Sequence, residues 1–131
     1  MQLANMRQPH VRGAYSIRGL IDVRRMISFV RHFDLVITSH NMFMHIARLH
    51  EIPALVLWGP SDHGFYGYTG HSHLQGKRTC ANAGGCIGPL TDGHQSSPCP
   101  MGDDHCMNTL KTEAIYQAAL EIAGTPTSSG R

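Results

Sequence analysis

A short polar segment contains the residues most suited to binding an anion. Residues 38–41 read Thr-Ser-His-Asn, at the end of an apolar, β-branched run over 33–38 and before a segment over 41–50 with helical apolar spacing. A strand that ends where a helix begins presents free backbone N–H groups and the positive helix end, which together bind phosphate. Either Ser39 or Asn41 can cap this helix, which leaves the other side chain for a ligand. The residues equally allow both to serve only as cap and turn, and His45 to be a partly buried structural residue.

Four cysteines form the second group of chemically capable residues. Their spacing is Cys-x5-Cys-x12-Cys-x6-Cys, whereas structural zinc sites usually have paired ligands about two to four residues apart. A structural zinc ion, free thiols and disulfides therefore remain open alternatives. The candidate metal ligands are Cys80, Cys86, Cys99 and Cys106, with His71, His73, His94 and His105 nearby.

Alternating helices and strands must position these residues. Two apolar runs, 33–38 and 54–58, predict buried strands, and helical spacing predicts helices before, between and after them. Right-handed crossovers make such strands parallel and bring their carboxyl ends to one edge, where ligands bind in open α/β sheets. The apolar positions predicted to face the core are Leu20, Val23, Ile27 and Val30 in the first helix, Met42, Ile46 and Leu49 in the second, and Ile115, Ala119 and Ile122 in the last.

The sequence therefore predicts one α/β domain with a Rossmann-like parallel sheet over residues 1–131. A helix-strand-helix-strand core spans 11–60, a long, irregular loop rich in Gly, His and Cys spans 61–110, and a closing helix spans 111–123. A structureless segment of that length needs a function or a cross-link to hold it.

Charge and composition exclude several classes of protein. With 41% hydrophobic residues the chain can bury a core, and a formal charge of +2 is too small to indicate nucleic-acid binding. Up to Arg48 there are seven basic and two acidic residues, so an anionic ligand would prefer this half; the arginines among them also fit a solvated helix face. The sequence shows no apolar run long enough to span a bilayer and no leader pattern, which predicts a cytoplasmic protein.

The run FDLVITSHNMFMHIARLHEIPALVLWGPSD resembles the donor-binding half of family 9 glycosyltransferases, the ADP-heptose:lipopolysaccharide heptosyltransferase group. In that family a strand ending in Thr is followed by Asp-Ser/Thr-Gly, two residues, His-x-Ala, a short helix, Pro, an apolar strand and Gly-Pro-Thr/Ser. The upstream VRGAYSIRGLI resembles the family's Gly-Lys-x-Ser/Thr-Leu-Arg-Glu-Leu stretch, and TCANAGGC resembles the cysteine-rich tail of one subgroup. The positions in register are Thr38, His45, Ala47, Pro53, Gly59, Pro60 and Ser61.

This resemblance implies the C-terminal, nucleotide-sugar-binding half of a GT-B enzyme of lipopolysaccharide biosynthesis, as a truncated domain. Three residues depart from the signature: His40 replaces the acidic residue, Asn41 the Ser or Thr, and Met42 the Gly that lets backbone approach phosphate closely. The family places its catalytic base on the other domain, so we expect no catalytic residue here and no glycosyl transfer by this chain alone. The expected nucleotide-sugar contacts are Thr38, Ser39, His40, Asn41, Met42 and His45.

Three functions stay open from the sequence. The first is a nucleotide-sugar-binding half that works with an N-terminal partner domain or as a homo-oligomer. The second is a module that binds a nucleotide or a protein without catalysis. The third is a small metal-binding α/β protein in which the cysteine loop is the functional part.

Overall fold

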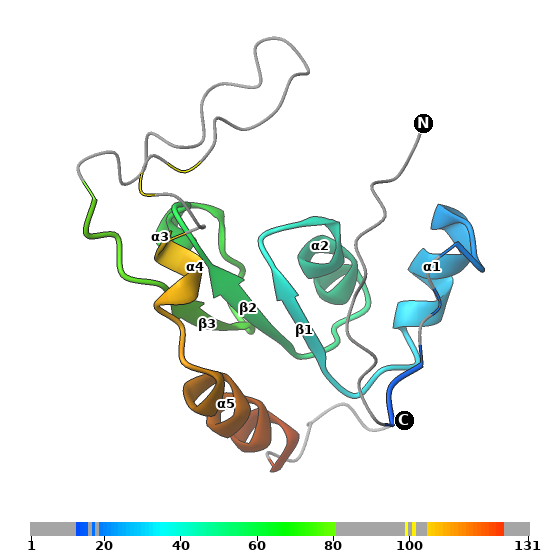
Figure 1. The fold of residues 1–131 in the computed structure, drawn as a ribbon. Coiled ribbons are helices and arrows are strands. Elements are labelled where there is room, and N and C mark those ends of the chain that lie inside the picture. Colours follow the sequence, from blue (N-terminus) through cyan, green and yellow to red (C-terminus); the bar gives the residue numbers. More distant parts are fainter. Residues whose placement is uncertain are drawn as a thin grey trace, which may run out of the picture.

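The computed structural model describes residues 13–15, 17, 19–80, 99, 101 and 105–124. They form an α/β fold around a three-stranded parallel sheet (Figure 1). The elements are α1 (Val23–Val30), β1 (Val36–Ser39), α2 (Met42–Leu49), β2 (Ala54–Trp58), α3 (His63–Tyr66), β3 (Ser72–Gln75), α4 (His105–Asn108) and α5 (Thr112–Gly124). No helix in these ranges is long and apolar enough to cross a membrane.

The strands follow one another across the sheet in the order β1-β2-β3. Val36 of β1 pairs with Ala54 of β2, and Leu55 of β2 pairs with Ser72 of β3. The predicted parallel pairing of the first two strands is thus confirmed. Because all three strands run the same way, their carboxyl ends meet at a single edge, which we call the carboxyl edge.

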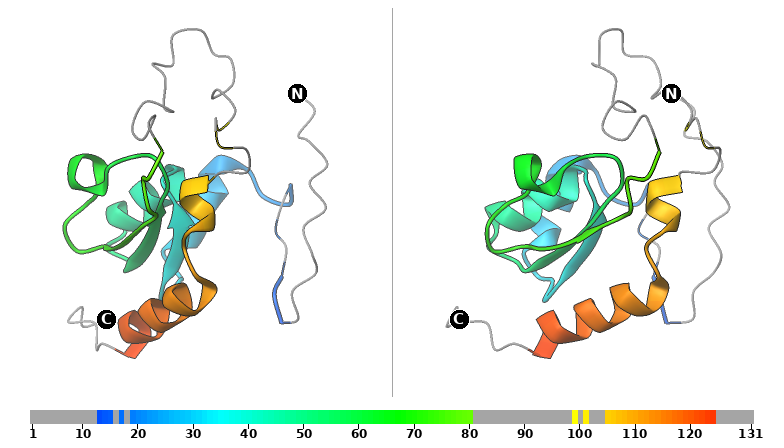
Figure 2. Two further views of the ribbon diagram at one scale, coloured as in Figure 1. Left: turned by 60° about the vertical axis from the view of Figure 1, so that its left-hand side comes forward. Right: turned by 90° about the vertical axis from the view of Figure 1, so that its left-hand side faces the viewer.

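The central strand β2 is covered on both faces, as its continuous apolar sequence requires. Ala54, Val56 and Trp58 belong to the main buried cluster, which they share with residues of α1 and α2. Leu55 points to the opposite face and lines a depression with Ala118 and Ile122 of α5. In both views of Figure 2, α5 lies below the sheet and α3 lies at the top.

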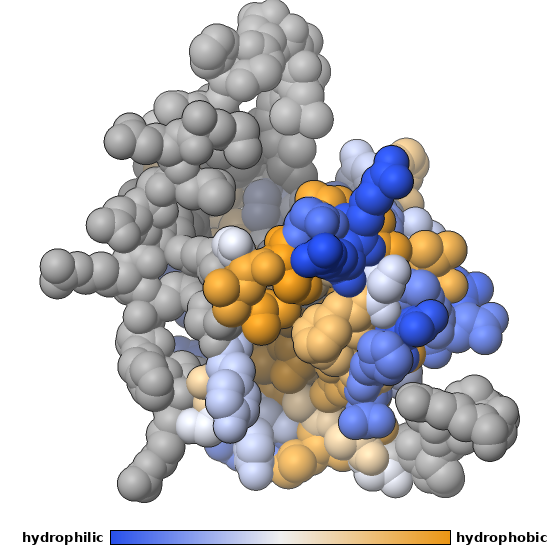
Figure 3. Space-filling model, turned by 90° about the vertical axis from the view of Figure 1, so that its right-hand side faces the viewer, coloured by the Kyte–Doolittle hydropathy of each residue, from blue (hydrophilic) through white to orange (hydrophobic). Residues whose placement is uncertain are grey.

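Helix α1 begins later than predicted. Asp22 is its N-cap and accepts a hydrogen bond from the backbone N–H of Arg25 at 2.9 Å. Val30 is fully buried, but Leu20 precedes the helix and is 70% exposed, so the prediction that it faces the core is wrong. Val23, in the first turn, is also exposed. Figure 3 shows this side of the molecule, where hydrophobic side chains gather between hydrophilic ones.

Helix α2 uses a different buried face from the one its spacing suggested. Met44, Ile46 and Ala47 are buried, whereas Met42 and Leu49 are exposed. Only Ile46 of the predicted stripe is therefore a core residue. The reason is that β1 and β2 contact the helix on the side of Met44 and Ala47.

The segment predicted as irregular contains a third strand and two short helices. Three of the four residues of strand β3 are half-buried, and the strand pairs with β2 on the side away from β1. Beyond it, the Gly76 backbone N–H donates to the Trp58 carbonyl at 2.8 Å. A Cβ at Gly76 would collide with the backbone carbonyl of Cys106, so this glycine permits α4 to approach the sheet. The prediction of irregular structure is thus wrong for 63–66, 72–75 and 105–108.

The closing helix α5 lies where the sequence predicts it. Its stripe residues Ile115, Ala119 and Ile122 are half-buried, and no residue of the helix is fully buried. The helix contacts β2 and β3 but does not cover β1, where Ile37 is half-exposed.

Candidate functional site

The N-terminus of α2 opens at the carboxyl edge, directly after β1. Asn41 is the N-cap residue, and its Oδ1 accepts from the Phe43 backbone N–H at 2.9 Å. The same oxygen accepts from the hydroxyl of buried Thr38 at 2.9 Å, and Asn41 Nδ2 donates to Ser39 Oγ at 3.0 Å. The sequence left open which residue caps the helix, and the structure assigns the cap to Asn41. Ser39 is exposed, and its hydroxyl proton stays available to a ligand.

His40 lies at this edge between two aromatic rings. Its imidazole centroid lies 4.8 Å from Trp58 and 5.2 Å from Tyr66, with tilted planes. Its Nδ1 is hydrogen-bonded to the hydroxyl of buried Ser61 at 3.1 Å, which links the ends of β1 and β2. Burial lowers the pKa of His40, and the neighbouring His45 lowers it further.

His45 lies one turn into α2 and is exposed. Its Nδ1 is 2.9 Å from the Tyr68 hydroxyl, and the two rings meet edge to face at 5.6 Å. One imidazole nitrogen of His45 is therefore engaged by the chain itself. Met42 is exposed at the first position of the helix, where the signature has Gly.

Side chains from β2, α3 and β3 form a second group at the carboxyl edge. The sequence did not indicate this group. Trp58 Nε1–H donates to His73 Nδ1 at 3.0 Å, and His73 Nε2 is 3.1 Å from the Tyr68 carbonyl. In this arrangement His73 Nδ1 carries no proton. The His63 ring stacks on that of His73 at 5.4 Å, and its Nδ1 contacts Gln75 Oε1 at 3.3 Å. Leu74 is the single apolar residue of 72–75, so no alternating pattern was available, and four residues are too few to separate a strand from a loop.

Asp62 and Arg78 form an ion pair at the side of the edge. Asp62 caps α3 by accepting from the Gly64 backbone N–H at 2.8 Å, and its other oxygen lies 3.2 Å from Arg78 Nη2. The Gly64 N–H contributes most to lowering the pKa of Asp62, followed by the hydrogen bond from Arg78. The guanidinium is thus paired with a carboxylate of the chain.

The cysteines do not converge with other ligands in the part of the chain that the structure describes. Cys80 and Cys99 are half-buried, Cys106 is buried, and Cys86 lies outside the described residues. Within the same ranges, no three His, Cys, Asp or Glu side chains are placed to hold a metal ion. His105 Nε2 is instead 3.2 Å from the Thr79 hydroxyl.

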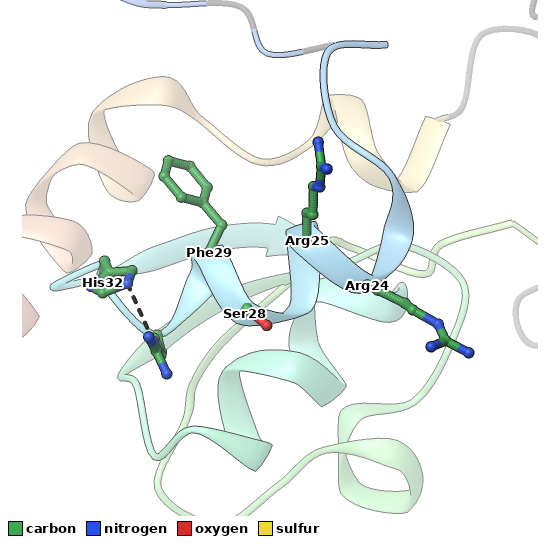
Figure 4. A pocket seen from close by; sticks show the side chains of 6 residues that line it. Arg24, Arg25, Ser28, Phe29 and His32 are labelled. Carbon is green, nitrogen blue, oxygen red and sulfur yellow. Dashed lines mark hydrogen bonds between the residues drawn. The ribbon is translucent and has the colours of Figure 1, made fainter.

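The basic face of α1 is a second place to consider for an anion. A shallow depression of ≈ 390 Å³ there is lined by Arg24, Arg25, Ser28, Phe29, Arg31 and His32 (Figure 4). Arg24 and Arg25 point in different directions, and Arg25 pairs with Asp22 at 3.6 Å. Arg31 Nε donates to His32 Nε2 at 3.2 Å. Since the guanidinium groups do not converge, this surface has the character of a solvated helix face.

Five of the six residues predicted for nucleotide-sugar binding are consecutive and run from the last two residues of β1 to the first residue of α2. His45 follows on the next turn of α2. Thr38 is buried and serves the cap, while the other five are exposed or half-buried. Comparison of the chain with family models, with curated proteins and with solved structures finds no match.

Proposed function

We propose that this chain is a nucleotide-sugar-binding domain, related to the Rossmann-like C-terminal half of family 9 GT-B glycosyltransferases. In this proposal the diphosphate of the donor binds at the carboxyl edge, over residues 39–42. The observation that carries the proposal is the opening of α2 directly beyond β1, with Ser39 exposed beside the first turn of the helix. Helix N-termini at the ends of parallel strands attract anions through free N–H groups and the helix dipole.

The sugar and the base would lie on either side of the diphosphate. His45 and the Tyr68 hydroxyl offer hydrogen-bond partners on the α2 side, 2.9 Å from each other. Tyr66, which is 48% exposed, and Phe65, which is 80% exposed, offer aromatic surface on the α3 side. A planar base can stack on such rings. The chain would supply contacts to the donor, and activation of the acceptor would come from a partner domain.

Binding of ADP-sugars and GDP-sugars, measured by calorimetric titration, tests this proposal. The informative variant is Asn41→Asp, because Asp caps a helix as well as Asn does and so keeps α2 in place. The new carboxylate would stand where the diphosphate binds, and we expect affinity to fall at least about tenfold through like-charge repulsion.

The matched control is Ser28→Asp, which adds the same charge on the exposed face of α1, away from the carboxyl edge. It should leave affinity within about twofold of the unmodified chain. Equal affinity for Asn41→Asp and the unmodified chain would refute binding at this edge. Equal losses of affinity in both variants would show that the added charge acts through the net charge of the chain and not at this edge, which would also refute the proposal.

A further inference from the structure

The positive charge available to an anion at the carboxyl edge depends on histidine, and His40 is best placed to supply it. Resting on the proposed function, we propose that His40 takes up a proton when a diphosphate binds, so that donor binding at this edge strengthens as the pH falls. The inference concerns a residue that replaces the acidic residue of the signature.

The permanently charged side chains nearby are poorly placed for this role. Arg78 is engaged by Asp62 at 3.2 Å. Lys77 follows β3, which β2 separates from β1 and the start of α2. A diphosphate at residues 39–42 would therefore meet imidazoles before it meets a fixed cation.

The surroundings of His40 tolerate either protonation state. Ser61 Oγ, 3.1 Å from His40 Nδ1, can donate to the bare nitrogen or accept from the protonated one. The rings of Trp58 and Tyr66, at 4.8 and 5.2 Å, present π surfaces to the imidazolium. His73 differs. Its Nδ1 accepts a hydrogen bond from the Trp58 N–H, and a proton on that nitrogen would bring two hydrogen-bond donors face to face.

Charged groups around His40 set the sign of the effect. Partial burial and, after it, His45 of α2 lower the pKa of His40, which favours the neutral imidazole in the free protein. On the far side, the His63 ring of α3 lies 6.3 Å from that of Trp58, and the Asp62 carboxylate is paired with Arg78. A bound diphosphate brings negative charge that the free site lacks. It favours the imidazolium, so binding and protonation are linked.

Linkage gives a measurable slope. One proton taken up per ligand makes the dissociation constant rise by up to about tenfold per pH unit above the pKa of free His40 and below that of the complex. ADP-glucose is the appropriate probe, because its diphosphate diester stays fully ionised throughout the range studied. Any pH dependence then originates in the protein.

The experiment is calorimetric titration of the full chain with ADP-glucose at four pH values from 5.5 to 8.5, in two buffers with different ionisation enthalpies. We expect proton uptake and weaker binding at higher pH in the unmodified chain. His40→Gln should remove the uptake and the slope, leaving weak binding at every pH. His40→Arg, whose planar guanidinium can also stack on Trp58 and Tyr66, should bind at every pH without a slope. His32→Gln, at an exposed position just beyond the C-cap of α1, should behave like the unmodified chain.

The two proposals fail in different ways. Binding of ADP-glucose with no proton uptake, or with uptake that persists in His40→Gln, would overturn the role of His40 and leave the proposed function in place. Absence of binding at all four pH values by a folded chain would overturn the proposed function and this inference with it. Trp58 fluorescence, from the single tryptophan of the chain, reports folding of each variant.

Discussion

Replacing Asn41 by Ala would test whether one side chain holds the candidate site together. Its Oδ1 accepts from the Phe43 N–H and from the Thr38 hydroxyl, both at 2.9 Å. Loss of an N-cap costs about 0.5–2 kcal/mol. The Thr38 hydroxyl can still donate to the Ser39 carbonyl at 3.1 Å. The variant therefore does not incur the full penalty of about 1–3 kcal/mol for a buried donor without an acceptor. We expect the free energy of unfolding to fall by about 1–2 kcal/mol.

Urea unfolding followed by Trp58 fluorescence measures this change, because Trp58 is fully buried beside the carboxyl edge. Asn41→Asp retains an acceptor for both donors and should lie within about 0.5 kcal/mol of the unmodified chain near neutral pH. Thr38→Val removes the second donor, so Asn41→Ala should cost less in that background. The reasoning is refuted if Asn41→Ala is neutral, or if Asn41→Asp destabilises the fold as much as Asn41→Ala does.

Three further outcomes follow from the packing, the titration and the cysteines. Gly76→Ala should destabilise the fold by about 1–3 kcal/mol, because its Cβ meets the Cys106 backbone; a neutral result in urea unfolding would contradict this contact. Burial lowers the pKa of His71, so the unfolded chain binds its proton more readily and stability should fall as the pH drops from about 7 to 5. His71→Gln should flatten that dependence in thermal melts, and an unchanged pH profile would argue against it. If the cysteines hold a structural zinc ion, elemental analysis of protein purified without added metal should find about one equivalent, and chelation should loosen the chain. Less than about a tenth of an equivalent of zinc, with four titratable thiols, would exclude a structural zinc ion held by the cysteines.

Two of the three strands of the sheet, β1 and β2, could be predicted from the sequence because each coincides with an apolar, β-branched run. The run 54–58 is apolar throughout, since β2 is covered on both faces, and the run over 33–38 ends one residue before β1 does. The turn that begins α2 was predicted for the same reason, because Ser and Asn between a strand and a helix favour capping. These features are local, and local patterns indicate them well.

The rest depends on tertiary contacts. Strand β3 has only four residues, with polar Ser72, His73 and Gln75 among them, and it forms because β2 offers a free edge. The buried face of α2 is set by the sheet on which the helix packs and not by the spacing of its apolar residues along the chain. Met44 is therefore buried and Met42 is exposed. The position of His40 between Trp58 and Tyr66 joins three segments and has no counterpart in sequence spacing.

The distribution of buried residues also has a consequence for how the molecule opens. The main cluster lies between α2 and one face of β2, whereas α5 has no fully buried residue and packs mainly on β2 and β3. Separation of α5 would expose Leu55 but leave the cluster around Val56 intact. Native-state hydrogen exchange should then divide the chain into two cooperative units. The amides of α5 would exchange through a partial opening of low free energy, and those of β2 only when the whole domain unfolds.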